Sequence, residues 1–166
     1  MKKILFLSCI LLLAKTSFGQ TCNDYISVST PDSRFSINGD EVTDSATGLI
    51  WQRCIFGQTG IGCNEGSNST YNWPSALQAA ETESDDTGLP WRVPNVRELR
   101  SIVEEKCDNP SINLSIFPNT PSSYFRTSSP YANGAWVVVF NDGNSERFTN
   151  IMIGNYHIRL VRDGSN

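Results

Sequence analysis

Trp91-Arg-Val-Pro-Asn-Val-Arg-Glu-Leu-Arg-Ser-Ile-Val-Glu-Glu105 is the stretch of this 166-residue chain around which the fold can be built. Asn95 is a residue type that caps helices, and Glu98, three residues later, can reach back to complete a capping box. The apolar residues that follow recur at the spacing of one helix face, so the stretch predicts an amphipathic helix that stops at Cys107. These apolar residues are Val96, Leu99, Ile102 and Val103.

The charged residues of the same stretch are expected to face water. Arg100 and Glu104 are four residues apart and can pair across one helical turn. Glu104 and Glu105 are adjacent, so their side chains diverge, and we interpret both as solvated charges. The residue before Pro94 is held extended, so Trp91 should enter as part of a short straight segment and be buried. The stretch therefore predicts a rigid corner at the centre of a single core.

Short apolar or alternating runs on both sides of this corner predict antiparallel strands. The expected strands cover residues 34–37, 41–44, 49–53, 124–128, 135–140, 145–149 and 158–162. The run at 135–140 is continuous and β-branched, which predicts a central strand. A first helix should begin near Asn72 and end in the acidic segment 81–88, and residues 57–71 should form a surface loop. Two helices packed on short strands indicate an α+β domain, with the four tryptophans in its core.

Several motifs of this chain together resemble those of a known family. The corner reads W-R-V-P-N-x-x-E-L-x-S-I-V, and V-T-D-S-A-T-G-L-I-W-Q-R-C and N-W-P-S-A-L-Q-A-A precede it at 42–54 and 72–80. Further motifs follow at 110–121, 135–143 and 158–162. They resemble the DUF1566 family, the C-terminal domain of the Legionella collagen-like adhesin, over residues 34–163. The resemblance implies a C-type-lectin-like fold with irregular loops, related to formylglycine-generating enzymes.

The N-terminal residues 1–19 have the features of a secretion signal. Lys2 and Lys3 precede an apolar run over residues 4–14, and small residues precede Gln20. The apolar run is too short to span a bilayer. We therefore expect a cleaved signal peptide over 1–19, an N-terminal tail over 20–33 and one domain over 34–163. The mature protein should be exported, periplasmic or extracellular at the cell surface, with no membrane insertion after signal cleavage.

The charge of the mature chain limits its partners. Removal of the signal removes three lysines and no acid, which leaves 10 basic residues against 17 acidic ones, a net charge of −7. Such a surface argues against nucleic acid and anionic membranes as partners. The adhesin of the resembled family binds sulfated glycosaminoglycans, but a net charge of −7 fits a polyanion poorly, so we do not transfer that ligand to this chain.

The mature chain has four cysteines, an even number that predicts two disulfides in an exported protein. Of the three possible connectivities we favour Cys54–Cys63, which closes a short glycine-rich loop, and Cys22–Cys107, which ties the tail to the end of the central helix. A zinc site is the alternative. It requires CxxC-like pairs or clustered histidines, and the sequence has neither.

The sequence contains no recognisable catalytic constellation. His157 is the only histidine, no G-x-S-x-G motif is present, and the glycines do not follow phosphate-loop spacing. His157 is expected to be a surface or packed residue. Formylglycine-generating enzymes use cysteines late in their domain, and no cysteine follows Cys107 here. We therefore expect no enzyme activity and no cofactor.

Aromatic rings and amides in loops are suited to ligand binding, because sugars stack on rings and form hydrogen bonds with amides. The candidates are Tyr71, Tyr124, Tyr131, Asn133, Asn155 and Tyr156, with packing or turn formation as the favoured alternative for each. Asn141, Asp142 and Glu146 are weak calcium candidates because carboxylate and amide oxygens gather there. However, Asn-Asp-Gly is also what a hairpin turn requires, so we expect no metal.

Two functional hypotheses remain. The first is an exported, non-catalytic, adhesin-like binding module that recognises a glycan or a protein surface. The alternative is a structural or assembly subunit of a bacterial surface or secretion apparatus, with a protein partner and no small ligand. The alternative predicts a broad exposed apolar patch. The oligomeric state is not predicted.

Overall fold

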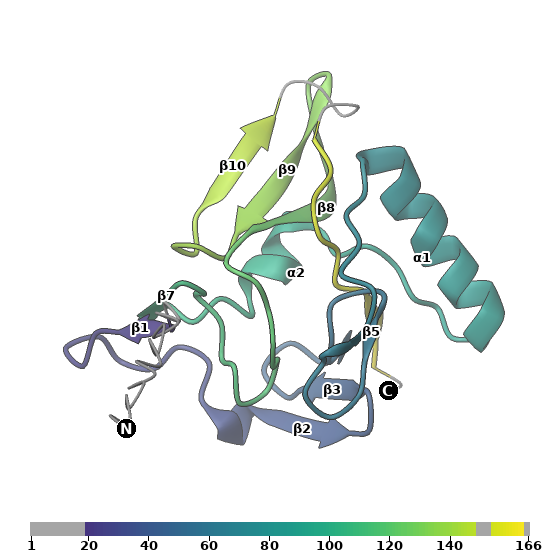
Figure 1. Ribbon diagram of the computed structural model, residues 1–166. Helices are drawn as coiled ribbons and strands as arrows, with labels where there is room; N and C mark the ends of the chain where they lie inside the picture. The colour runs from purple at the N-terminus through teal and green to yellow at the C-terminus, as the bar shows by residue number, and fades with distance from the viewer. Residues whose placement is uncertain (1–18, 149–153, 165–166) are drawn as a thin grey trace, which may run out of the picture.

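The computed structural model describes residues 19–148 and 154–164 and shows an α+β arrangement (Figure 1). Its helices are α1 (Trp73–Thr87) and α2 (Val96–Arg100), with a 3-10 turn at Asp32–Arg34. The strands are β1 (Thr21–Cys22), β2 (Phe35–Asn38), β3 (Glu41–Asp44), β4 (Leu49–Gln52), β5 (Gln58–Thr59), β6 (Glu65–Gly66), β7 (Cys107–Asp108), β8 (Tyr124–Tyr131), β9 (Gly134–Val139), β10 (Ser145–Phe148) and β11 (Val161–Asp163). The predicted α+β class is confirmed, whereas the lectin-like name for it stays a prediction. The expected signal peptide lies outside the described residues except for Gly19.

Two antiparallel sheets form the body of the fold. One has the strand order β11-β4-β3-β2 and the other β10-β9-β8, so the predicted central position of β9 is confirmed. The pairs β1-β7 and β5-β6 are separate, and the second of them lies within the segment predicted to be a loop. The predicted last strand is shorter than expected, because the carbonyls of Ile158 and Leu160 bond to Phe56 and Gln52 without forming a regular ladder.

The corner around Trp91 joins two clusters of buried apolar residues, where the sequence predicted one core. Trp51 and Val161 belong to the larger cluster, which also contains Leu99 of α2. Leu160 belongs to the smaller cluster, together with Trp91 and residues of α1, and Ile50 packs against this cluster. Successive side chains of a strand point to opposite faces, so the two faces of the β4–β11 pair serve different clusters.

The capping box that begins α2 is confirmed. The side-chain oxygen of Asn95 accepts bonds from the N–H groups of Arg97 and Glu98, and the Glu98 carboxylate accepts one from the N–H of Asn95 at 2.7 Å. The predicted length of the helix is wrong, because α2 ends at Arg100. Residues 102–104 are all buried, which the single apolar face of an amphipathic helix cannot achieve.

Helix α1 begins near Asn72 and ends within the acidic segment 81–88, both as predicted. Its N-cap is Asn72, whose side chain accepts a bond from the N–H of Ser75. The helix continues through the acidic segment to Thr87 and ends at Gly88, which has φ +68°. Glycine adopts this left-handed conformation without the steric cost that other residues incur.

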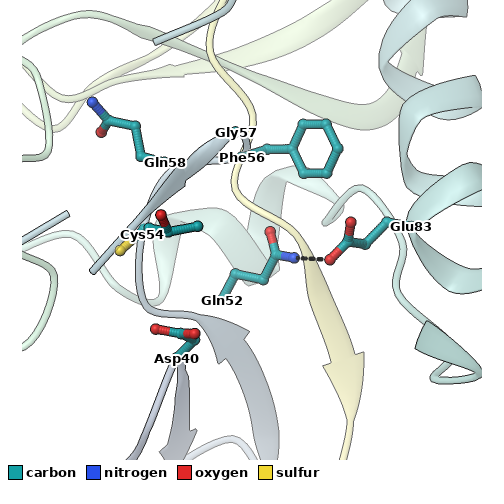
Figure 2. Close-up of a pocket in the computed structure, with 8 residues that line it drawn as sticks. Asp40, Gln52, Cys54, Phe56, Gly57, Gln58 and Glu83 are labelled. Atoms are coloured by element: carbon teal, nitrogen blue, oxygen red, sulfur yellow. Dashed lines mark hydrogen bonds between the residues drawn. The ribbon is translucent and has the colours of Figure 1, made fainter. Parts of the chain in front are cut away.

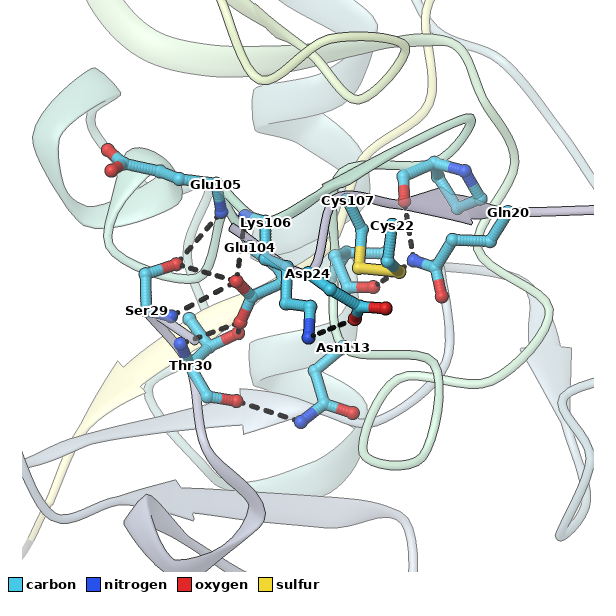
Figure 3. The surroundings of a disulfide bond; sticks show 12 residues. Gln20, Cys22, Asp24, Ser29, Thr30, Glu104, Glu105, Lys106, Cys107 and Asn113 are labelled. Carbon is cyan, nitrogen blue, oxygen red and sulfur yellow. Dashed lines mark hydrogen bonds and ion pairs between the residues drawn. A yellow bond between two sulfur atoms is a disulfide. The ribbon is translucent and has the colours of Figure 1, made fainter. Parts of the chain in front are cut away.

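Both predicted disulfides, Cys22–Cys107 and Cys54–Cys63, are present. Cys22 and Cys107 lie opposite each other in the β1–β7 pair, so the N-terminal tail is tethered as expected. The tail has a second anchor in Glu104, whose carboxylate accepts bonds from Ser29 and Thr30 (Figure 3). Glu104 is only 3% exposed, so its predicted solvation is wrong.

The expected pair between Arg100 and Glu104 does not form. The Glu104 carboxylate is occupied by the tail, and Arg100 instead donates to the hydroxyl of Ser145 on β10 at 3.4 Å. Glu105 is exposed, as predicted. The two neighbouring glutamates therefore have opposite environments, because the chain has left the helix before it reaches them.

Candidate functional site

An exposed cation lies against two aromatic rings on one face of the β10-β9-β8 sheet. Arg147 of β10 is paired in register with Trp136 of β9. Its guanidinium lies 5.2 Å from the centre of the Trp136 ring and 4.9 Å from that of Tyr131. The two rings pack edge to face with centroids 5.8 Å apart, and Tyr131 is 36% exposed. Trp136, expected in the core, is half-buried.

Helix α2 brings two further arginines beside this face. Arg97 and Arg100 are three residues apart and therefore neighbours on the helix surface, and both are exposed. The bond from Arg100 to Ser145 links α2 to β10 two residues from Arg147. We call this surface the arginine–aromatic face; it consists of Arg97, Arg100, Tyr131, Trp136 and Arg147.

The arginines of this face have no acidic partner. Within residues 19–148 and 154–164, no carboxylate lies within 4.0 Å of the guanidinium of Arg97, Arg100 or Arg147. Arg34, Arg92 and Arg162 behave differently, because each of them forms an ion pair. The positive charge of the arginine–aromatic face is thus available to a ligand, although the whole chain is acidic.

The opposite face of the same sheet holds a cluster of tyrosines around Arg126. This arginine is fully buried, and its guanidinium lies 4.6 Å from the centre of the Tyr156 ring. It donates to the carbonyls of Tyr71 and Gly154 at 3.3 and 2.6 Å. Burial lowers the pKa of Arg126 and raises the pKa of Tyr156. The cluster therefore holds the segment that begins at Gly154 against the sheet.

The structure divides the six predicted ligand-binding residues into two groups. Tyr71, Tyr124 and Tyr156 meet: Tyr71 and Tyr156 exchange backbone bonds at 2.8 and 3.0 Å, and the rings of Tyr124 and Tyr156 are 5.5 Å apart. All three are half-buried, whereas Asn155 beside them is exposed. Tyr131 and Asn133 lie at the β8–β9 turn. A role in ligand binding stays a prediction for all six.

Sequence reasoning did not single out Arg97, Arg100 or Arg147 as site residues. A local signal was present for the first two, because arginines three apart on a helix share one side. Nothing in the sequence indicated that Arg147 would lie beside them, because α2 and β10 are far apart along the chain. Arg100 and Ser145, which bond to each other, are 45 residues apart.

Residues 40–162 match the family model described as the Lcl C-terminal domain. The chain belongs to the Lcl C-terminal domain family. This confirms the family suggested by the motifs around Trp91. No curated protein and no solved structure matches the chain. The arginine–aromatic face is made entirely of residues within the matched segment.

The weak calcium candidates of this Lcl C-terminal domain form a turn. The carboxylate of Asp142 accepts bonds from the backbone and side-chain nitrogens of Asn144 at 3.1 and 2.8 Å. Asn141 accepts a bond from the hydroxyl of Ser122, and Glu146 is exposed on β10. In the described part of the chain, no group of three or more His, Cys, Asp and Glu residues could hold a metal ion.

The single histidine of the domain is packed. His157 is buried, and its backbone bonds to both Tyr124 and Arg126, so it fixes the last segment against β8. Burial lowers its pKa. No helix among the described residues is long and apolar enough to cross a membrane.

Proposed function

We propose that this chain is an exported, non-catalytic, adhesin-like binding module that recognises anionic groups on a glycan or protein surface through its arginine–aromatic face. Membership of the Lcl C-terminal domain family supports the adhesin-like role. The two disulfides support export, because such bonds persist in oxidising compartments. The observation that carries the proposal is the set of three exposed guanidiniums without an acidic partner.

The chemistry of this face suits anionic groups. A guanidinium presents parallel N–H donors that match a carboxylate or sulfate in two bonds at once. Neighbouring rings add contact area for the apolar face of a sugar or for an aromatic side chain. Arg147 lies over both rings and therefore presents its charge at a defined position.

The net charge of −7 does not prevent such binding. Exposed charges are screened over about 8 Å at physiological ionic strength, so acids elsewhere on the molecule repel an anion only weakly. The nearby basic groups act at contact distance, where the interaction is strongest. The negative net charge therefore weakens the long-range attraction of an anion but not its contact with this face.

The combined variant Arg97→Ala, Arg100→Ala, Arg147→Ala is expected to bind an anionic polysaccharide at least about tenfold more weakly than the wild type, because each lost charge-assisted bond contributes about 1.5 kcal/mol or more. The measurement is the affinity of the oxidised mature protein for immobilised heparin, with neutral dextran as the comparison. Binding of the wild type should also weaken with added salt.

A matched control makes the same change in net charge at another place. Ser75→Glu, Gln78→Glu, Thr82→Glu changes the net charge by −3 on exposed positions of α1 and should retain most of the binding. Equal affinity of the arginine variant and the wild type for heparin would contradict the proposal. Preference for dextran over heparin would do so as well.

One observation favours the second candidate, an assembly subunit with a protein partner. Tyr25, Ile26 and Val28 are exposed large apolar residues within four positions of the tail, and Tyr25 is 100% exposed. The combined variant Tyr25→Ser, Ile26→Ser, Val28→Ser should then lose a protein that copurifies with the wild type from the exporting cell. Its binding to heparin should not change. If the variant and the wild type copurify with the same proteins, this part of the tail is not the docking element.

A further inference from the structure

A cleft of about 260 Å³ opens between the end of β4, the glycine-rich loop that follows it, and α1 (Figure 2). None of the residues that line it belongs to the arginine–aromatic face. Acidic, amide and aromatic side chains make up most of its wall. The main lining residues are Asp40, Gln52, Cys54, Phe56, Gln58 and Glu83.

Polar groups meet in this cleft because two apolar surfaces end there. On α1 the buried side runs through Ala76 and Ala80, and the next residue on that side is Glu83. On β4, Ile50 packs on the smaller apolar cluster, and Gln52 is the next residue on the same face. The Gln52 amide donates to the Glu83 carboxylate at 2.9 Å (Figure 2).

The cleft has more hydrogen-bond acceptors than its own residues use. Neither Asp40 nor Glu83 forms an ion pair among the described residues. Since the Gln52 nitrogen donates to Glu83, its oxygen is left to accept from a ligand. Figure 2 shows the Gln58 amide directed away from Gln52 and Glu83. Gln58 therefore forms part of the wall but offers no acceptor beside them.

The wall of the cleft is held by contacts behind it. Buried Arg159 donates to the carbonyl of Gln52 at 2.9 Å and also to that of Arg53. The Cys54–Cys63 disulfide closes the loop that carries Phe56. Within this loop Gly57 has φ +92°, and a Cβ there would lie 2.7 Å from a backbone oxygen. The cleft is therefore preorganised, which lowers the cost of ordering a ligand.

We propose that this cleft binds a single neutral sugar ring. Carboxylate and amide oxygens accept bonds from sugar hydroxyls, and the Phe56 ring offers a surface for the apolar face of the ring. Among the described residues that line the cleft none is cationic, which disfavours an anionic sugar. Its volume is just below the range of about 300–1,000 Å³ typical of pockets for drug-sized ligands, which fits one ring.

This inference goes beyond the proposed function. The arginine–aromatic face would bind anionic groups, whereas the cleft would bind a neutral residue at a separate place. Each site has its own ligand class and its own variants, so failure of one proposal leaves the other intact.

The test is a titration of the oxidised mature protein with glucose, galactose, mannose, fucose and N-acetylglucosamine, followed through backbone amide NMR shifts. At least one sugar should shift the amides of Gln52, Phe56 and Gly57 saturably, with a dissociation constant of about millimolar order. Because the ligand is neutral, added salt should leave the binding unchanged.

Two variants on the same helix separate the cleft from a general effect of charge. Glu83→Ala should weaken the binding of the sugar about tenfold, since a bond to a charged group contributes about 1.5 kcal/mol or more. Glu81→Ala removes the same charge from a position that lines a different groove and should bind as the wild type does. Alanine favours helix, so both variants are expected to fold.

Three outcomes would overturn the proposal. The first is the absence of saturable shifts at the cleft with every sugar. The second is equal binding by Glu83→Ala and the wild type. The third is a response only to a cationic probe such as ethanolamine that disappears with salt, which would make the cleft a site for amines.

Discussion

Replacing Glu104 by alanine is expected to lower the free energy of unfolding by about 3 kcal/mol or more. Glu104 is 3% exposed, and its carboxylate accepts bonds from the N–H groups of Ser29, Thr30 and Lys106 at 3.0, 2.8 and 2.9 Å. The hydroxyls of Ser29 and Thr30 add bonds at 3.2 and 2.7 Å. Truncation removes all five acceptor contacts and leaves buried donors without a partner.

The midpoint of urea unfolding at neutral pH measures this loss. Hydrogen exchange of the Ser29 and Thr30 amides should accelerate more than that of the β9 amides, because the tail loses its anchor first. Glu105→Ala is the control, since this neighbour carries the same charge but is exposed; its effect should stay within about 0.5 kcal/mol. Equal midpoints for both variants would show that the carboxylate does not hold the tail.

The same interaction should depend on pH. Burial would raise the pKa of Glu104, but the bonds from Ser29, Lys106 and Thr30 outweigh it and hold the pKa below its ordinary value of 4.5. A carboxyl group whose pKa is lower in the folded state stabilises the fold above the unfolded-state pKa. This stability is lost as the pH falls through the folded-state pKa. The stability difference between the wild type and Glu104→Ala should therefore shrink below about pH 4.5.

Local signals made much of the fold predictable. The capping box at Asn95 involves residues three apart, and the β2–β3 hairpin depends on Gly39 with φ +61°. The disulfide Cys54–Cys63 spans nine residues, so its pairing could be inferred from a loop that bends easily. In each of these, the partners are close in the sequence and the chemistry of a few residues decides the geometry.

The candidate sites could not be predicted in the same way, because their residues meet through tertiary packing. The bond between Gln52 and Glu83 joins residues 31 apart, and nothing in the spacing relates a strand end to the middle of a helix. The Glu104 anchor joins residues 75 apart at Ser29. Two adjacent glutamates are usually solvated, and only the early end of α2 at Arg100 places one of them inside.

Arg159 shows how a predicted strand can conceal a buried charge. The two arginines of the predicted strand over residues 158–162 suggest positions that face water. In the fold Leu160 packs into the smaller apolar cluster and Val161 into the larger one, so both sides are covered. Arg159 is consequently 0% exposed. The sequence position of this residue gave no sign that its charge would be enclosed.

Arg159→Ala is expected to lower the free energy of unfolding by about 4 kcal/mol. The guanidinium donates to the carbonyls of Gln52 and Arg53 and to the hydroxyl of Thr120 at 2.7 Å. It also lies 4.8 Å from the centre of the Phe117 ring. Truncation creates a cavity and leaves these acceptors unpaired, two costs that add. Arg97→Ala, an exposed control, should cost less than about 0.5 kcal/mol by urea unfolding.

A second variant separates the charge of Arg159 from its volume. Burial lowers the pKa of Arg159 to about 9, so enclosing the charged form at neutral pH carries a cost that its hydrogen bonds must offset. Arg159→Met fills most of the space without this cost and should destabilise less than Arg159→Ala. It still leaves the carbonyls of Gln52 and Arg53 free to move, so the sugar affinity of the cleft should fall. Unchanged affinity in Arg159→Met would mean that the disulfide and the glycine-rich loop hold the cleft without the guanidinium.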